Sequence, residues 1–333
     1  MNANLQVCVR RFPRDVVGVD DFELREAAMP EPAEGEVLVQ SHFLSLDPYM
    51  RKRLADAREG RYPLSTGDVM MGRTVGSVIA SRDPAFKTGD VVLGWGGWQR
   101  YAAEPGQNLQ KVEPLEGGSL SAHLGVLGRP GITAWLGIVS VAQLREGDCL
   151  VVSSAAGAVG SLAAQMARHL GARVVGIAGG DAKCDAVTRQ LGAHACVDYK
   201  APDFAQRLID ATPDGVDVVF ENVGAGVLDA TLDRMNPNGR IAVCGLMGHY
   251  HSGEPYAFRH FARVLDRALK VTGFRIDDNI PLHGRALRDL RAWFDAGVFR
   301  PWETVTHGLE HAPDAFVSML QGRGQGKTLV QLT

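Results

Sequence analysis

The sequence has few cysteines and no pattern that would join them. Its five cysteines include no C-x-x-C pair, so we expect neither a disulfide framework nor a zinc knuckle. Three of the five lie in or beside apolar runs, where a cysteine serves as a small hydrophobic side chain.

Strong charge of one sign and long apolar runs are also missing. The formal net charge is -3 and the basic residues are spread along the chain, which argues against nucleic acid or an anionic membrane as a partner. No window approaches the ~20 apolar residues that span a bilayer. Residues 1–15 also lack the apolar stretch of a signal peptide. We therefore expect a cytoplasmic protein.

What the sequence does have is length and many turn residues. Its 333 residues, 39 of them Gly, exceed the ~250 to 300 at which a single core stops growing. Residues 1–126 read as short strands between Gly and Pro turns, which predicts a β-rich domain. Residues 127–300 alternate strands with helices. Residues 301–333 hold one short helix and one strand, which we expect to complete the first domain.

The most informative stretch is 148–180. An apolar run at 150–152 leads through a small-residue turn into helical spacing, and a second β-branched run follows, as in a βαβ unit. The turn residues are Gly157, Ala158, Val159 and Gly160. The match to G-x-G-x-x-G is incomplete because Ala155 takes its first position. Taken alone, such a turn also fits close packing of a helix on a sheet.

The downstream chain favours the dinucleotide-binding interpretation. Strands are expected at 195–199, 216–222, 240–246 and 270–276. The expected helices cover 182–191, 204–211, 227–235, 258–265 and 285–296. Six strands alternating with helices predict an α/β fold with a doubly wound parallel sheet of the Rossmann type.

The end of the second strand indicates which dinucleotide is bound. An NAD site usually carries an acidic residue there to hold the ribose 2′-OH, but this strand ends in Ala178, Gly179 and Gly180. Lys183 and Tyr199 supply a cation and a hydroxyl that suit a 2′-phosphate, while Asp181 is interpreted as a helix N-cap. The sequence predicts NADP(H).

Two further stretches leave alternatives open. Tyr49 follows Asp-Pro and is expected on a loop beyond a strand end, either facing a site or satisfied locally. Trp95 and Trp98 either shape a pocket or belong to the β-domain core. At the junction of the domains, Thr133 is expected to begin a helix that runs to about 141.

Several motifs together identify a family. The motifs are SLDPYMR (45–51), LGRPGITAWLG (127–137), AAGAVGS (155–161), VVGIAGGDAKC (174–184), DYK (198–200), FENVG (220–224) and GRIAVCGL (239–246). With them the chain, from about residue 35 onward, resembles the zinc-free medium-chain dehydrogenase/reductases, in the branch of leukotriene B4 dehydrogenase, prostaglandin reductases and 2-alkenal reductases. The resemblance implies a GroES-like catalytic domain beside the Rossmann domain, and a homodimer.

The resemblance also implies roles for individual residues. It assigns the turn 157–160 to the pyrophosphate, Lys183 and Tyr199 to the 2′-phosphate, and Asn222 to the nicotinamide ribose. Gly179, at the end of the second strand, is a further candidate cofactor-binding residue. Residues matched to the walls around the nicotinamide are Thr133, Cys244, Gly245, Leu246, Tyr250, Phe274, Arg275 and Ile276. Tyr49 and Tyr250 match aromatic residues of the substrate pocket. The chain departs from the family pattern at Gly324, Asp266 and Arg129.

No metal is expected. Zinc-dependent relatives need a Cys and a His-Glu pair in the first domain and a four-cysteine lobe, whereas only Cys8 precedes Cys149 here. His249 and His251 form a lone pair on a loop, and such pairs are usually solvated side chains.

A metal-free site favours reduction of a C=C bond conjugated to a carbonyl. Hydride from NADPH reaches the β-carbon of an α,β-unsaturated aldehyde or ketone, and the charge collects on an enolate oxygen that needs a hydrogen-bond donor. Tyr250 is the first candidate for this donor and Tyr49 the second. The alternatives are an NADPH quinone reductase and a catalytically idle NADPH-binding protein.

Overall fold

The chain divides into two units, which are described separately. The computed structural model describes residues 3–55, 64–115, 118–248 and 255–332. One unit consists of 1–124 and 303–333, and the other of 125–302. The boundaries expected from the sequence differ from these by two residues at each junction. Within the described ranges, none of the helices combines the length and the apolar character needed to cross a bilayer.

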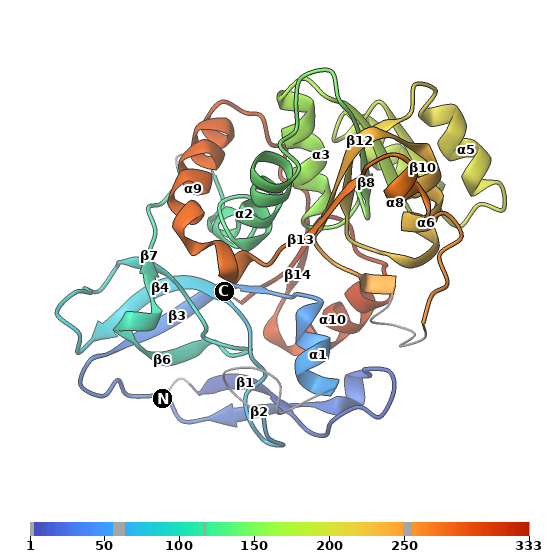
Figure 1. Cartoon of the computed structure of the whole chain (residues 1–333). Coiled ribbons are helices and arrows are strands. Elements are labelled where there is room, and N and C mark those ends of the chain that lie inside the picture. The colour runs from blue at the N-terminus through green and yellow to red at the C-terminus, as the bar shows by residue number, and fades with distance from the viewer. Residues whose placement is uncertain (1–2, 56–63, 116–117, 249–254, 333) are drawn as a thin grey trace. The chain divides into compact units, whose positions relative to one another are not determined.

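The second unit contains the predicted parallel sheet. Its six strands are all parallel, in the order β10-β9-β8-β11-β12-β13. Figure 1 labels β8, β10, β12 and β13 of this sheet. The strands are β8 (Cys149–Ser153), β9 (Arg173–Ala178), β10 (Ala195–Asp198), β11 (Val216–Glu221), β12 (Met235–Val243) and β13 (Lys270–Gly273). The order reverses at β8, where β9 lies on one side and β11 on the other. This is the switch point at which doubly wound sheets bind ligands, so the expected fold class is confirmed.

Helices cover both faces of this sheet. They are α2 (Arg129–Trp135), α3 (Gly160–His169), α4 (Asp181–Arg189), α5 (Phe204–Ala211), α6 (Ala225–Arg234), α8 (Arg263–Asp266) and α9 (Ile280–Asp295). Leu208 of α5 and Val227 of α6 share a buried cluster with Val175 and Val197 of the sheet. On the opposite face, Val187 of α4 lies against Gly176. Buried apolar strands between two helical layers explain why the strand sequences are nearly continuous in Val and Ile.

Three local expectations for this unit were wrong. Thr133 lies in the middle of α2, because the helix begins at Arg129 with Pro130 in its first turn and continues as a π-helical turn over Leu136–Val141. Asp181 is the first residue of α4, and Gly180, with φ 95°, takes the capping position. The helix expected at 258–265 is only Arg263–Asp266.

The first unit is built mainly of antiparallel strands. Strands β1 (Asn4–Val9) and β2 (Phe22–Ala27) pair with each other. The larger sheet has the order β14-β15-β3-β4-β5-β7, with β6 paired to β3. Its strands are β3 (Glu36–Ser45), β4 (Thr74–Ser81), β5 (Val91–Gly94), β6 (Tyr101–Pro105), β7 (Gln110–Lys111), β14 (Glu303–His307) and β15 (Lys327–Gln331). The C-terminal strand β15 pairs with β3, so both ends of the chain belong to this unit.

Two α-helices and an aromatic cluster complete the described part of the first unit. The helices are α1 (Tyr49–Ala55) and α10 (Ala312–Leu320). Trp98 is fully buried and stacks on Phe22 with ring centroids 5.2 Å apart, while Phe316 meets Trp98 edge-on. Trp95 is 42% exposed. The two tryptophans therefore differ: Trp98 belongs to the core and Trp95 lies at the surface of the unit.

Candidate active site

The turn between β8 and α3 depends on its glycines. A side chain on Gly160 would run into the carbonyl oxygen of Ser154, and a Cβ on Gly157 would lie 2.9 Å from the Ser154 hydroxyl. Ser154 itself adopts a positive φ of 52°. The close approach of the turn to the strand end therefore explains the glycine spacing in the sequence.

The same turn presents backbone donors. The Gly157 amide donates to the Ser154 carbonyl at 2.9 Å, whereas the amides of Ala158, Val159 and Gly160 donate no backbone hydrogen bond in the described part of the chain. These groups stand at the N-terminus of the ten-residue helix α3. Unsatisfied amides and the positive end of a helix dipole suit the oxygens of a pyrophosphate.

Asn222 is fixed at the end of β11 by the neighbouring strand β8. Its backbone amide donates to the Ser153 hydroxyl and its side-chain amide to the Ser153 carbonyl, both at 2.7 Å. The Ser153 hydroxyl donates at 2.8 Å to Oε1 of Glu221, which also accepts the amides of Val223 and Gly224. Glu221 is fully buried, and this burial raises its pKa. Sequence reasoning missed Ser153 and Glu221. The signal that could have identified Glu221 is an acidic residue inside an apolar strand.

The segment 244–246 lies against Asn222. The amides of Cys244 and Gly245 donate to the Glu221 carbonyl at 2.8 and 3.1 Å. A Cβ on Gly224 would lie 2.9 Å from the Leu246 side chain. The structure thus brings together Asn222 and the segment 244–246, both of which the family resemblance assigned to the nicotinamide end of the cofactor.

Tyr250, with His249 and His251, lies outside the described residues. The chain leading to it is tied to the turn after β11, because the Met247 amide donates to the Asn222 carbonyl at 3.0 Å and the Gly248 amide to the Val223 carbonyl at 2.9 Å.

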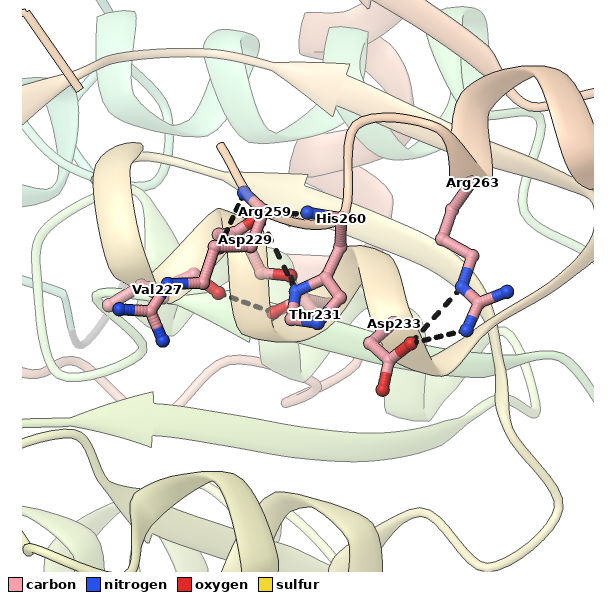
Figure 2. Close-up of polar contacts among 7 residues, drawn as sticks. All are labelled: Val227, Asp229, Thr231, Asp233, Arg259, His260 and Arg263. Atoms are coloured by element: carbon pink, nitrogen blue, oxygen red, sulfur yellow. Dashed lines mark hydrogen bonds and ion pairs between the residues drawn. The ribbon is translucent and has the colours of Figure 1, made fainter. Parts of the chain in front are cut away.

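The chain that follows residue 254 is anchored on α6 (Figure 2). The buried Asp229 carboxylate accepts the backbone amides of Arg259 at 3.0 Å and His260 at 2.9 Å. One turn further along α6, Asp233 pairs with Arg263 at 2.9 Å. Both flanks of residues 249–254 are therefore held by the β11–α6 unit.

Phe274, Arg275 and Ile276 follow β13. The Phe274 amide donates to the Val243 carbonyl at 3.3 Å, and its ring lies 6.4 Å from that of Phe220. Arg275 is exposed, and Ile276 begins a 3-10 turn. Phe274 is thus the member of this group that is fixed by packing.

Helix α2, which carries Thr133, is tied to the same segment. Arg129 pairs with Asp277 through two hydrogen bonds of 2.8 and 3.2 Å, and this pairing lowers the pKa of Asp277. A Cβ on Gly137 would lie 3.0 Å from the Phe274 ring. Arg129, a departure from the family pattern, therefore joins α2 to the segment 276–279.

The ends of β9 and β10 form a corner held by Asp198. Its Oδ1 accepts the amides of Gly180 at 2.8 Å and Lys200 at 2.9 Å, and these two bonds lower the pKa of Asp198. A Cβ on Gly179 would lie 2.9 Å from the Tyr199 ring and 3.1 Å from the Lys200 side chain. Because Gly179 has no side chain, the side chains of Tyr199 and Lys200 can pack closely against its backbone.

Two lysines bring positive charge to this corner. Burial, together with the ammonium group of Lys200, lowers the pKa of Lys183. The Lys200 ammonium lies 5.9 Å from the centre of the Tyr199 ring, and Tyr199 is 44% exposed. A phosphate dianion would relieve the repulsion between the two ammonium groups, so the residues present fit the 2′-phosphate of NADPH. Lys200 was not singled out from the sequence.

Tyr49 lies in the first unit and opens the short helix α1, so the expected loop was wrong. The preceding turn is fixed by the buried Lys327 of β15, whose ammonium donates to the Leu46 carbonyl at 2.7 Å and to Asp47 at 2.9 Å. Ser45 donates to the other oxygen of Asp47 at 2.5 Å. Tyr49 is 37% exposed and follows Asp47 of this turn by two residues.

A buried carboxyl group lies near Trp95 in the same unit. Oε2 of Glu104 accepts the Trp95 amide at 2.6 Å, and Oε1 is buried without a partner among the described residues. Burial raises the pKa of Glu104 to about 7, against the opposing effects of the Trp95 amide and of Arg73. The Arg73 guanidinium stacks on the Trp95 ring at 5.1 Å. The signal that sequence reasoning missed is the inward position of Glu104 in the alternating strand β6.

No group of three or more His, Cys, Asp or Glu side chains with a metal-binding arrangement occurs in residues 3–55, 64–115, 118–248 and 255–332.

Two family signatures match the chain. The family described as "N-terminal domain of oxidoreductase" matches residues 6–112, and the family described as "Zinc-binding dehydrogenase" matches residues 158–282. The first match falls in the β-rich unit and the second in the unit with the parallel sheet.

Named reductases and a solved structure resemble the whole chain. The NADPH-dependent curcumin reductase of Escherichia coli (strain K12) is 39% identical over 322 residues, which cover 94% of this chain and 92% of that protein. The NADP(+)-dependent 2-alkenal reductase of Nicotiana tabacum is 35% identical over 339 residues, with 99% and 98% covered. The crystal structure of CurA in complex with NADPH from Vibrio vulnificus has a TM-score of 0.91 at 39% identity and covers 99% of both chains.

Proposed function

Because this chain belongs to the medium-chain dehydrogenase/reductase family of NADP-dependent oxidoreductases, we propose that it reduces the C=C bond of α,β-unsaturated aldehydes or ketones with NADPH. The similar proteins are named curcumin reductase and 2-alkenal reductase. These names support an enone or enal as the substrate class.

The observation that carries the choice of cofactor is the corner of Lys183, Tyr199 and Lys200. Two neighbouring ammonium groups, one of them with a lowered pKa, favour a ligand that brings a dianion. Gly157, Ala158, Val159 and Gly160 would hold the pyrophosphate, and Asn222 would orient the nicotinamide ribose. We expect the corner to distinguish NADPH from NADH, and the turn and Asn222 to bind both cofactors.

When bound, NADPH supplies a hydride that the β-carbon of the substrate receives. The chain must then stabilise negative charge on the substrate carbonyl oxygen, and a tyrosine hydroxyl is a suitable donor. Tyr49 and Tyr250 are the candidates. The fixed turn before Tyr49, held by Lys327 and Asp47, supports its use as a preorganised group.

We further propose that the enzyme needs no metal and acts as a homodimer in the cytoplasm. The dimer is testable by light scattering after size exclusion. A dimeric mass is expected, and a monomer at all concentrations would contradict it.

The test of the activity is NADPH oxidation in the presence of a chelator, with a 2-alkenal, a longer enone and a quinone offered separately. Turnover of the enal or enone, with a much higher KM for NADH, is expected. Turnover of the quinone alone would replace the proposal with quinone reduction. NADPH binding without turnover of any acceptor would indicate a binding protein.

A further inference from the structure

Arg73 and Trp95 lie at the edge of the larger sheet from which the chain turns toward Tyr49. The first residue of β4, which directly follows Arg73, pairs near the end of β3 on one side and with the last residue of β5 on the other. Trp95 directly follows β5, and the Arg73 carbonyl accepts the amide of Ser45, the last residue of β3, at 2.9 Å. From Ser45 the chain enters the turn that leads to Tyr49. Three strand ends therefore place Arg73 and Trp95 beside the turn of a candidate hydrogen-bond donor.

The Arg73 guanidinium is stacked on an aromatic ring. Its central carbon lies 5.1 Å from the centre of the Trp95 ring. Arg73 is half-buried, and Trp95 is 42% exposed. Stacking uses the face of the planar guanidinium, whereas its N–H donors point outward in the plane. A guanidinium fixed in this way is preorganised to bind a carboxylate through two parallel hydrogen bonds.

A buried carboxyl group supports this pair. Oε2 of Glu104 accepts the Trp95 amide at 2.6 Å. A Cβ on Gly94 would lie 2.5 Å from Oε1, which is buried without a partner among the described residues. Burial raises the pKa of Glu104 to about 7, although the Trp95 amide and Arg73 oppose the rise. At about pH 6 the carboxyl group is therefore mostly neutral, and it does not cancel the positive charge of Arg73.

We propose that Arg73, stacked on Trp95, determines substrate specificity by binding a carboxylate group that the substrate carries. The enzyme then prefers an enone or enal whose chain ends in a carboxylate to a neutral one of the same length. The guanidinium binds the carboxylate, and the exposed part of the Trp95 ring packs against the apolar chain that carries it. The preference in turnover rests on the proposed function, whereas binding of the carboxylate does not.

The experiment compares an enone whose alkyl chain ends in a carboxylate with its methyl ester, at about pH 6 and with saturating NADPH. The KM for the acid should be lower than that for the ester by at least about tenfold. R73A should raise the KM for the acid by about 10- to 150-fold and leave that for the ester within about twofold. R73K, which keeps the charge without the paired donors, should give an intermediate value. R82A is the matched control, because Arg82 follows the other end of β4, is exposed and pairs with Glu34, and it should change neither KM.

Calorimetry gives a second readout that needs no turnover. The saturated keto acid and its methyl ester, which are the products of the two substrates, are titrated into the protein with NADP+ present. The acid should bind more tightly than the ester, and R73A should weaken only the acid. Equal changes for acid and ester in R73A would overturn the proposal. A lower kcat for both substrates at unchanged KM would also overturn it, because the guanidinium would then act on the enolate oxygen. Binding of the acid that depends on Arg73, without turnover of any enone, would instead refute the proposed activity alone.

Discussion

Replacing Lys183 with alanine tests the assignment of the 2′-phosphate corner. Lys183 is half-buried on α4, and its burial, together with the nearby ammonium group of Lys200, lowers its pKa. A hydrogen bond to a charged group contributes ~1.5 to 3 kcal/mol, which corresponds to a rise of about 10- to 150-fold in the KM for NADPH. Because NADH has no 2′-phosphate, its KM should stay the same. The exposed Lys200 should contribute less, about 2- to 5-fold in K200A.

The assay is steady-state oxidation of each cofactor with one fixed enal, over a range of cofactor concentrations. The matched control is R189A, which removes an exposed cation of the same helix that pairs with Asp185. Circular dichroism should show that all three variants are folded. The pH gives a second readout: since the pKa of Lys183 is lowered, NADPH binding should weaken at high pH before an ordinary lysine would lose its proton, and K183A should lack this change.

Two results would refute the reasoning. An equal rise in KM for NADPH and NADH would mean that Lys183 supports the fold of the corner without recognising the phosphate. An equal effect in K183A and R189A would mean that the cofactor responds only to the overall charge of α4. Either outcome would remove the structural basis for preferring NADPH.

Features encoded locally could be predicted from the sequence. The parallel sheet follows from apolar runs with glycine turns, and the β8–α3 turn requires glycine at 157 and 160 because Ser154 lies against both. Lys183 and Tyr199 follow strands β9 and β10, and the carboxyl ends of adjacent parallel strands meet at one edge. Contacts of this kind can be predicted once the order of the strands is known.

The missed features join residues far apart in the chain. Lys327 reaches Asp47 across 280 residues and Ser153 reaches Glu221 across 68, so no local pattern contains them. The helix expected at 258–265 failed for a related reason. Asp229 of α6 captures the amides of residues 259 and 260, which holds that stretch in a non-helical turn.

Three further predictions concern the rest of the site and its support. Of Tyr49→Phe and Tyr250→Phe, the variant that loses the hydrogen-bond donor to the substrate oxygen should lower kcat by about 10²- to 10³-fold, and unchanged kcat in both variants would refute the donor role of either tyrosine. Lys327→Ala leaves Asp47 without its buried partner, so urea unfolding should show a free energy of unfolding that is lower by about 3 to 5 kcal/mol. A decrease below about 1 kcal/mol would contradict that role. Glu104 should make stability depend on pH. Its pKa rises from 4.5 to about 7 on folding, so the folded state binds the proton more tightly, and the free energy of unfolding should fall as pH rises between these values, by at most about 3 kcal/mol. Urea unfolding at about pH 5 and about pH 8 measures this slope, which E104Q should flatten because the amide does not titrate. An equal slope in E104Q would place the pH dependence elsewhere.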